Sequence, residues 1–180
     1  ILNNFEGIVI LDEAYIDFSE EPSFLPELKK FPNLIILQTL SKAWGAAGIR
    51  LGMAFASPEI VAILNKIKYP YNVNVLTQER ALDILNNETE MLRQLRSIMS
   101  ERIRLQAALP ELFAVKKMYP TDANFILVDV GKANSVYNKL VRKGVIVRNR
   151  NNVTLCHGCL RITVGTPEEN DALLKALKSI

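Results

Sequence analysis

Three short apolar runs in the first third of the 180-residue chain constrain its fold more than any other feature. They cover residues 7–11, 34–37 and 50–55, the last of which begins with Arg50. A continuous apolar run of this length, rich in β-branched residues, is typical of a strand that is buried on both faces. The sequence therefore predicts an α/β fold in which these runs form neighbouring strands.

After the third run the pattern changes to helices. Residues 57–59 (Ser-Pro-Glu) predict a helix start, because serine is a favoured N-cap and proline a favoured first helical residue. This helix is expected to end at about Lys68. A helical pattern then runs from about residue 77 to residue 109, which is longer than most helices of globular proteins. We therefore expect a bend or a domain crossing near residues 86–87.

The second half of the chain mixes short strands with flanking helices, which is an α+β pattern. The boundary between two domains is expected inside the long helix, near residue 95, so that residues 1–95 and 96–180 form separate domains. The expected strands cover residues 113–118, 124–130, 144–148 and 160–164, and the expected helices cover about 133–143 and 167–178.

The composition is that of a globular protein, with 49% apolar and 23% charged residues. No apolar run approaches the roughly 20 residues of a membrane-spanning helix, and the first residues lack the pattern of a signal peptide. The chain begins with Ile1 rather than Met, so we expect a truncated sequence. The net charge of +3 is spread along the chain and gives no indication of nucleic-acid binding. Two cysteines are too few for a disulfide scaffold, which favours a cytoplasmic location.

The segment Cys156-His157-x-Cys159 raises the possibility of a zinc site. The chain has one histidine and no other cysteine, so four nitrogen and sulfur ligands are not available from it. A loop that carries two small thiols is the favoured interpretation, and we expect no metal.

The chemically reactive side chains follow the predicted strands. Ligands of an open α/β sheet bind at the carboxyl ends of the strands. The first strand leads into Asp12 and Tyr15, and the third begins at Arg50. The segment between the second and third strands carries two hydroxyls, a lysine and two glycines that permit close backbone approach: Thr39, Ser41, Lys42, Gly45 and Gly48.

Taken singly, each of these residues has an ordinary explanation. An aspartate at a strand end is usually a turn or helix cap, and a lone lysine or arginine is usually a solvated charge or part of a surface ion pair. The combination of an acid, a tyrosine, hydroxyls, a lysine and an arginine at adjacent strand ends favours a binding pocket instead.

The sequence Asp-Glu-Ala-Tyr at 12–15, followed by Thr-Leu-Ser-Lys-Ala-x-Gly-x-Ala-Gly-Ile-Arg-Leu-Gly at 39–52, resembles the cofactor segment of fold type I pyridoxal-phosphate aminotransferases. The resemblance covers the whole chain but only the later part of the family. It implies the C-terminal part of a large domain with a mostly parallel sheet, followed by a small α+β domain. The upstream phosphate-binding turn, ring-stacking aromatic and Asn-Pro segment of the family are absent, which implies that these 180 residues alone are inactive.

The resemblance also implies a role for each residue of the segment. Lys42 holds pyridoxal 5′-phosphate covalently and moves the proton during catalysis. Asp12 pairs with the pyridine nitrogen, and Tyr15 donates to the phenolic oxygen. The cofactor phosphate is bound by Thr39, Ser41 and Arg50, the last of them through charge-assisted bonds.

Residues 145–148 and 159–166 resemble C-terminal segments of the histidinol-phosphate branch of the family, and each carries an arginine. The resemblance implies that Arg161 receives the substrate carboxylate or phosphate, and two arginines suit a phosphate dianion better than one. For Arg148 the ordinary alternative is a solvated charge in the basic run 148–150.

The implied reaction transfers an amino group between glutamate and imidazole-acetol phosphate, as in histidine biosynthesis, with a small-molecule amino donor and a phosphorylated keto acceptor. The alternatives are an aminotransferase of the same family that acts on aromatic or other amino acids, and a truncated fragment that only folds and self-associates. The family implies a homodimer, with residues 69–72 (Tyr-Pro-Tyr-Asn) as a candidate contact.

Overall fold

The computed structural model describes all 180 residues and divides them into two compact units, Ile1–Leu92 and Arg93–Ile180. The division falls in helix α3 (Glu88–Ala108), the long helix in which the sequence predicts a domain boundary near residue 95. None of the helices combines the length and the apolar character needed to span a membrane.

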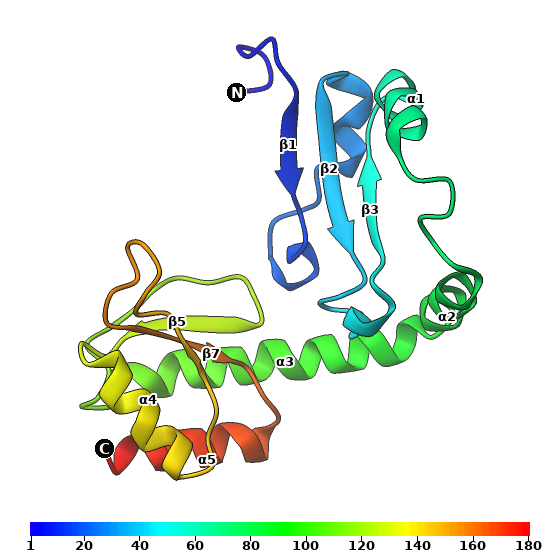
Figure 1. The fold of residues 1–180 in the computed structure, drawn as a ribbon. Coiled ribbons are helices and arrows are strands. Elements are labelled where there is room, and N and C mark those ends of the chain that lie inside the picture. The colour runs from blue at the N-terminus through cyan, green and yellow to red at the C-terminus, as the bar shows by residue number, and fades with distance from the viewer. The chain divides into compact units, whose positions relative to one another are not determined.

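The first unit contains a three-stranded sheet in the order β1-β2-β3 (Figure 1). Strands β1 (Val9–Asp12) and β2 (Leu34–Thr39) are parallel, with Val9 opposite Leu34. Strand β3 (Gly52–Phe55) is antiparallel to β2, with Gly52 opposite Thr39. The expectation of a mostly parallel sheet is therefore corrected: the sheet is mixed, because the short connection through residues 40–51 turns the chain back along β2.

The apolar runs had indicated that all three strands are buried on both faces. This prediction is wrong for β1. Leu34 and Ile36 of β2 are buried, but Ile8 and Ile10 beside and within β1 are 58% and 61% exposed. Strand β1 lies at the edge of the sheet, and nothing in this unit packs on the side that carries Ile8 and Ile10. An apolar run thus predicted the strand correctly but not its burial.

The helices of the first unit follow the sequence closely. Helix α1 (Pro58–Ile67) begins where predicted, and the Ser57 side chain accepts a hydrogen bond from the Ile60 N–H as its N-cap. Helix α2 (Val75–Leu85) is separated from α3 by Asn86 and Asn87, where a bend was expected. The short 3₁₀ helices η1 (Ile16–Phe18), η2 (Leu25–Lys30) and η3 (Ala47–Ile49) complete the connections between strands.

The second unit is an antiparallel sheet in the order β4-β5-β7-β6, with helices on one face (Figure 1). Its central strands β5 (Phe125–Asp129) and β7 (Cys159–Thr163) run beside the short edge strands β4 (Lys117–Met118) and β6 (Arg148–Asn149). Helices α4 (Ala133–Arg142) and α5 (Pro167–Lys178) pack on this sheet with most of α3.

The core of the second unit lies between the sheet and its helices. One face of β5 and β7 is buried, while the residues between, such as Phe125 and Arg161, belong to the opposite face because strand side chains alternate. The fully buried residues of this core include Leu105, Leu109, Ile126, Val128, Leu140, Leu160 and Ile162.

Two expected strands of this unit are shorter than predicted. Of residues 113–118 only 117 and 118 pair, because the chain continues from α3 through the 3₁₀ helix η4 (Leu109–Glu111) and a turn. Of residues 144–148 only Arg148 pairs. Gly144, at a φ of +76°, and Val145 instead end α4, and the Val145 N–H donates to the Leu140 carbonyl.

Candidate active site

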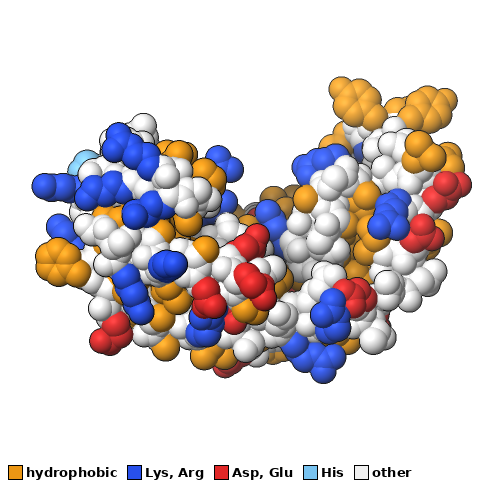
Figure 2. Space-filling model, turned by 90° about the horizontal axis from the view of Figure 1, so that it is seen from below, with side chains coloured by type: hydrophobic (Ala, Val, Ile, Leu, Met, Phe, Trp, Pro, Cys, Tyr) orange, Lys and Arg blue, Asp and Glu red, His pale blue; other side chains and the backbone are white.

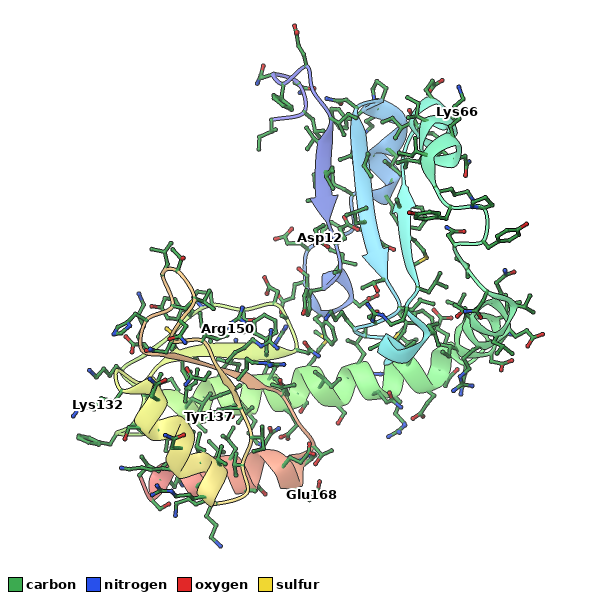
Figure 3. The ribbon with its side chains drawn as sticks, in the orientation of Figure 1. Asp12, Lys66, Lys132, Tyr137, Arg150 and Glu168 are labelled. Atoms are coloured by element: carbon green, nitrogen blue, oxygen red, sulfur yellow. The ribbon has the colours of Figure 1, made fainter.

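The strand ends of the first unit bring the predicted cofactor residues to one edge of the sheet. Asp12 is the last residue of β1 and Thr39 the last of β2, and these strands are parallel. Strand β3 is antiparallel and begins at Gly52, so the segment that carries Arg50 approaches the same edge. Figure 3 labels Asp12 at this end of β1. The topology therefore gathers three separate segments at one place.

The lysine of this edge lies beside a tyrosine. Lys42 and Tyr15 are both half-buried, and the Lys42 Nζ lies 5.2 Å from the centroid of the Tyr15 ring. An ammonium within about 6 Å of an aromatic ring is attracted to it. Leu40 and Ala46, both buried, anchor the segment on either side of Lys42. The amine is thus held near the end of β1 by a fixed backbone and by the ring.

Asp12 and its neighbour Glu13 have different surroundings. Asp12 is exposed, and its Oδ1 accepts a hydrogen bond of 3.0 Å from the Ala14 N–H. Glu13 is buried, and its carboxylate accepts bonds from the Ser23 hydroxyl (2.7 Å), the Phe24 N–H (2.7 Å) and the Gln38 amide (2.9 Å). Burial alone would raise the pKa of Glu13, but these hydrogen bonds to the charged form outweigh it and lower the pKa. Glu13, the residue after Asp12, therefore connects the segment at Ser23 and Phe24 to Gln38 of β2.

Two hydroxyls stand together at the end of β2. The Thr39 Oγ1 lies 3.0 Å from the Ser41 Oγ and 3.2 Å from the Leu51 carbonyl oxygen, and it accepts a bond from the Ser41 N–H. Both side chains are half-buried. Paired hydroxyls of this kind can donate to the oxygens of an anion.

Arg50 has an unusual backbone for its residue type. Its φ is +56°, in the left-handed region, and one guanidinium nitrogen donates to the Ala47 carbonyl at 2.8 Å. Non-glycine residues in this region carry strain and cluster at functional sites. Gly45, at a φ of +63°, adopts the same region without a side chain and leaves open space where a Cβ would stand. Arg50 is exposed, so the rest of its guanidinium is open to a ligand beside this turn.

The second unit holds the two predicted substrate arginines. Arg148 on β6 is directly opposite Arg161 on β7, and directly opposed residues share a face of the sheet. Both line a pocket of about 490 Å³ whose other walls are Tyr137, Ile146, Val147, Asn149 and Thr163.

The Arg161 side chain packs against an aromatic ring. Its guanidinium carbon lies 4.9 Å from the centroid of the Phe125 ring on the neighbouring strand β5. Its Nε is buried and has no hydrogen-bond partner in the protein. A buried donor without a partner costs free energy, so a ligand that accepts this hydrogen would be favoured.

Sequence reasoning missed Glu13 and Phe125. Glu13 was only part of the quoted motif, and no sequence signal distinguished it from the exposed Asp12, because its hydrogen-bond partners lie 10 to 25 positions away. Phe125 could not be found from the sequence, because 36 positions separate it from Arg161 and only the β5–β7 register brings them together. For the cysteine segment, the chain contains no group of three or more His, Cys, Asp and Glu side chains placed to hold a metal ion.

An α/β chain that gathers a lysine amine, a carboxylate, two hydroxyls and a strained arginine at one sheet edge has the parts of a group-transfer enzyme that works beside an anion site. The chain belongs to the class I and II aminotransferases, because the model of that family, "Aminotransferase class I and II", matches residues 1–177.

Individual relatives are more specific. The chain is 66% identical over 180 residues to a histidinol-phosphate aminotransferase of Parabacteroides distasonis. This match covers 100% of the chain and 52% of that protein. Its fold matches the histidinol-phosphate aminotransferase of Clostridium acetobutylicum with a TM-score of 0.87, 27% identity, and coverage of 96% and 53% of the two chains. The enzyme of Sinorhizobium meliloti, solved in complex with pyridoxal-5′-phosphate, matches with a TM-score of 0.77 and 26% identity, covering 96% and 48%. The chain thus spans about half the length of these relatives.

Proposed function

We propose that this chain is the part of a pyridoxal-phosphate-dependent aminotransferase that holds the cofactor lysine and the substrate arginines. Its reaction is the transfer of the amino group of histidinol phosphate to 2-oxoglutarate, which gives imidazole-acetol phosphate and glutamate. The observation that carries the substrate assignment is the pairing of Arg148 and Arg161 across β6 and β7 in one pocket.

The residues at the sheet edge of the first unit fit the cofactor. Pyridoxal phosphate, when bound, supplies an aldehyde that bonds to an amine and a ring that withdraws electrons from the substrate α-carbon. Lys42 offers the amine that holds the aldehyde and that carries a proton once the substrate amine has replaced it. Asp12 offers an exposed carboxylate for the protonated ring nitrogen, and the Tyr15 hydroxyl serves the phenolic oxygen.

Thr39, Ser41 and Arg50 fit the phosphate of the cofactor. Thr39 and Ser41 present their hydroxyls 3.0 Å apart, and Arg50 adds a guanidinium beside the glycine turn. Charge-assisted hydrogen bonds are about twice as strong as neutral ones, so Arg50 would supply much of the affinity for the phosphate.

The charge of the second unit supports an anionic substrate. Residues 93–180 contain 15 Lys and Arg against seven Asp and Glu, a formal charge of +8, whereas residues 1–92 contain seven against 12. The expectation that the charge is spread evenly along the chain is therefore wrong. Figure 2 shows Lys and Arg side chains gathered around the only histidine, which belongs to the loop after β6. A positive field of this kind raises the local concentration of anions and the rate at which they bind.

We also propose a cytoplasmic homodimer. The two cysteines are free, as is usual in a reducing compartment. Tyr69 and Tyr71, which were expected to contribute to a subunit contact, are 84% and 95% exposed in the single chain. Large aromatic side chains are enriched at interfaces, which supports this segment as part of one.

The decisive experiment uses the full-length protein that carries this chain. The preparation should be yellow, borohydride should fix the cofactor to the peptide that contains Lys42, and a panel of amino donors should show highest kcat/KM with histidinol phosphate. Lys42→Ala should lower turnover by several orders of magnitude, because the covalent anchor and the proton carrier are lost together. The matched control is Lys66→Ala, on the exposed part of α1.

The outcomes separate the alternatives. Near-normal turnover of Lys42→Ala would overturn the cofactor assignment. A yellow, borohydride-reactive protein that prefers an aromatic or aliphatic amino acid would keep the cofactor residues and replace the substrate. A full-length protein that neither binds the cofactor nor transaminates would overturn the proposed function.

A further inference from the structure

The reaction proposed above makes no use of the two cysteines, which lie in the loop that joins β6 to β7. The Cys159 N–H donates to the Cys156 carbonyl at 3.0 Å, and Gly158 between them has a φ of +78°. This is the pattern of a type II turn, which needs a positive φ at its third residue. The ends of such a turn lie within about 7 Å of each other, and a disulfide needs Cα atoms about 4.4–6.8 Å apart. The turn therefore places the two Cα atoms at a separation that a disulfide can span.

The two thiols differ in access. Cys159 begins β7 and is 1% exposed, and its Sγ lies 3.7 Å from the His157 carbonyl oxygen. Burial, followed by the negative charge of Asp129 and by Cys156, raises the pKa of the Cys159 thiol. Cys156 is half-buried. A reagent in solution can thus reach Cys156 but not Cys159.

The backbone around the turn is tightly specified. The Arg150 N–H donates to the Cys159 carbonyl, and the Gly158 N–H donates to the Asn151 side chain at 3.1 Å. A Cβ at Gly158 would meet Asp129 Oδ1 at 2.9 Å. The cysteines are held in one geometry by contacts on both sides of the turn, and Cys159 stands two residues before Arg161 on the same strand.

We propose that Cys156 and Cys159 form a reversible disulfide by exchange with a low-molecular-weight disulfide. The Cys156 thiolate attacks one sulfur of the reagent and releases a thiolate, which leaves a mixed disulfide on Cys156. Cys159 then loses its proton and attacks the Cys156 sulfur, which releases the second reagent thiol. The protein loses two hydrogens and is oxidised, and the reagent disulfide takes them up as two thiols. This site is independent of the substrate assignment.

The experiment uses the purified full-length protein and oxidised glutathione near neutral pH, followed by a thiol-blocking reagent and trypsin. Cleavage after Arg150 and Arg161 yields one peptide, residues 151–161, that contains both cysteines. In the unaltered protein this peptide should lack two hydrogens and carry no blocking group, and dithiothreitol should restore both thiols.

The variants test the order of attack. Cys159→Ser should stop at a stable mixed disulfide with one glutathionyl group on Cys156, and Cys156→Ser should remain unmodified at Cys159. Cys159→Ala replaces the first variant if circular dichroism shows that the serine variant is unfolded. The proposal is overturned if the unaltered peptide retains glutathione or two blockable thiols after long exposure, or if Cys156→Ser is modified as fast as Cys159→Ser.

Discussion

Arg148 and Arg161 stand directly opposite each other on β6 and β7, with both guanidinium groups on the pocket side of the sheet. Like charges in this position destabilise a sheet, and neither arginine forms an ion pair with a carboxylate of the second unit. The Nε of Arg161 is also buried without a partner. A bound anion would offset all three costs, and a dianion would offset them more than a carboxylate. Under the proposed function, we therefore expect this pair to discriminate a phosphorylated substrate from a carboxylate.

Arg148→Ala should separate the two substrates of the full-length enzyme. The loss of one or two charge-assisted hydrogen bonds, at about 1.5–3 kcal/mol each, should raise KM for histidinol phosphate by about tenfold or more. KM for glutamate should change far less, because Arg161 alone can grip a carboxylate bidentately. Steady-state kinetics with each substrate measures both constants.

Arg142→Ala is the matched control, because Arg142 is an exposed arginine at the end of α4. An equal rise of both Michaelis constants in Arg148→Ala would make Arg148 a general electrostatic element. No rise in either would make it a solvated surface charge, and the substrate assignment would lose one of its two arginines.

Phe125 should matter through Arg161. Phe125→Leu removes the ring 4.9 Å from the guanidinium, a contact worth about 0.5–2 kcal/mol when partly desolvated. The guanidinium is then free to leave the orientation that the ring favours. KM for both substrates should rise several-fold while kcat changes little. Phe125→Tyr keeps the aromatic face and should behave like the unaltered enzyme. A fall in kcat with unchanged KM would show that the ring acts on something other than anion binding.

Local pattern predicted much of the fold. Helix α5 begins and ends at the residues expected from the sequence, because Thr166 and Glu169 form a capping box whose signal lies within four residues. The break between α2 and α3 at Asn86 and Asn87 was also predicted, because a helical pattern of that length rarely continues unbroken. The sequence order of Asp12, Lys42 and Arg50 likewise indicated which residues lie near strand ends.

Features that depend on distant contacts were not predictable. The exposure of Ile10 depends on whether another element packs on the edge strand β1. The apolar run has the same sequence whether or not such an element is present. Residues 145–147 have the composition of a strand, but the Val145 N–H is used to end α4. The Arg161–Phe125 contact exists only because β5 and β7 are neighbours, which the order of elements along the chain does not reveal.

The charge of the second unit predicts a salt dependence. With histidinol phosphate as donor, kcat/KM should fall several-fold as ionic strength rises from about 0.05 to 0.5 M, because screening shortens the reach of the positive field. The slope should be shallower with unphosphorylated histidinol. Neutralising Lys139 and Lys143 together should flatten the slope for the phosphorylated donor without changing kcat, since both are exposed and neither lines the pocket of Arg148 and Arg161. Identical slopes for the two donors would show that the field does not steer the phosphate.

Glu13→Gln should destabilise the first unit in a pH-dependent way. The carboxylate accepts three hydrogen bonds, and an amide in its place turns an NH₂ toward at least one donor, at a cost of about 1–3 kcal/mol. Because the pKa of Glu13 is lowered in the folded state, its contribution to stability is fully present above the unfolded pKa, near 4.5, and is lost as pH falls through the folded pKa. The urea midpoint, followed by the fluorescence of Trp44, the only tryptophan, should therefore be lower in Glu13→Gln at pH 7. The difference should shrink progressively once the pH falls below about 4.5.

Glu6→Gln, at an exposed glutamate of the same unit, should match the unaltered chain at pH 7. A Glu13→Gln midpoint that equals the unaltered one at pH 7 would show that the three hydrogen bonds do not depend on the charge.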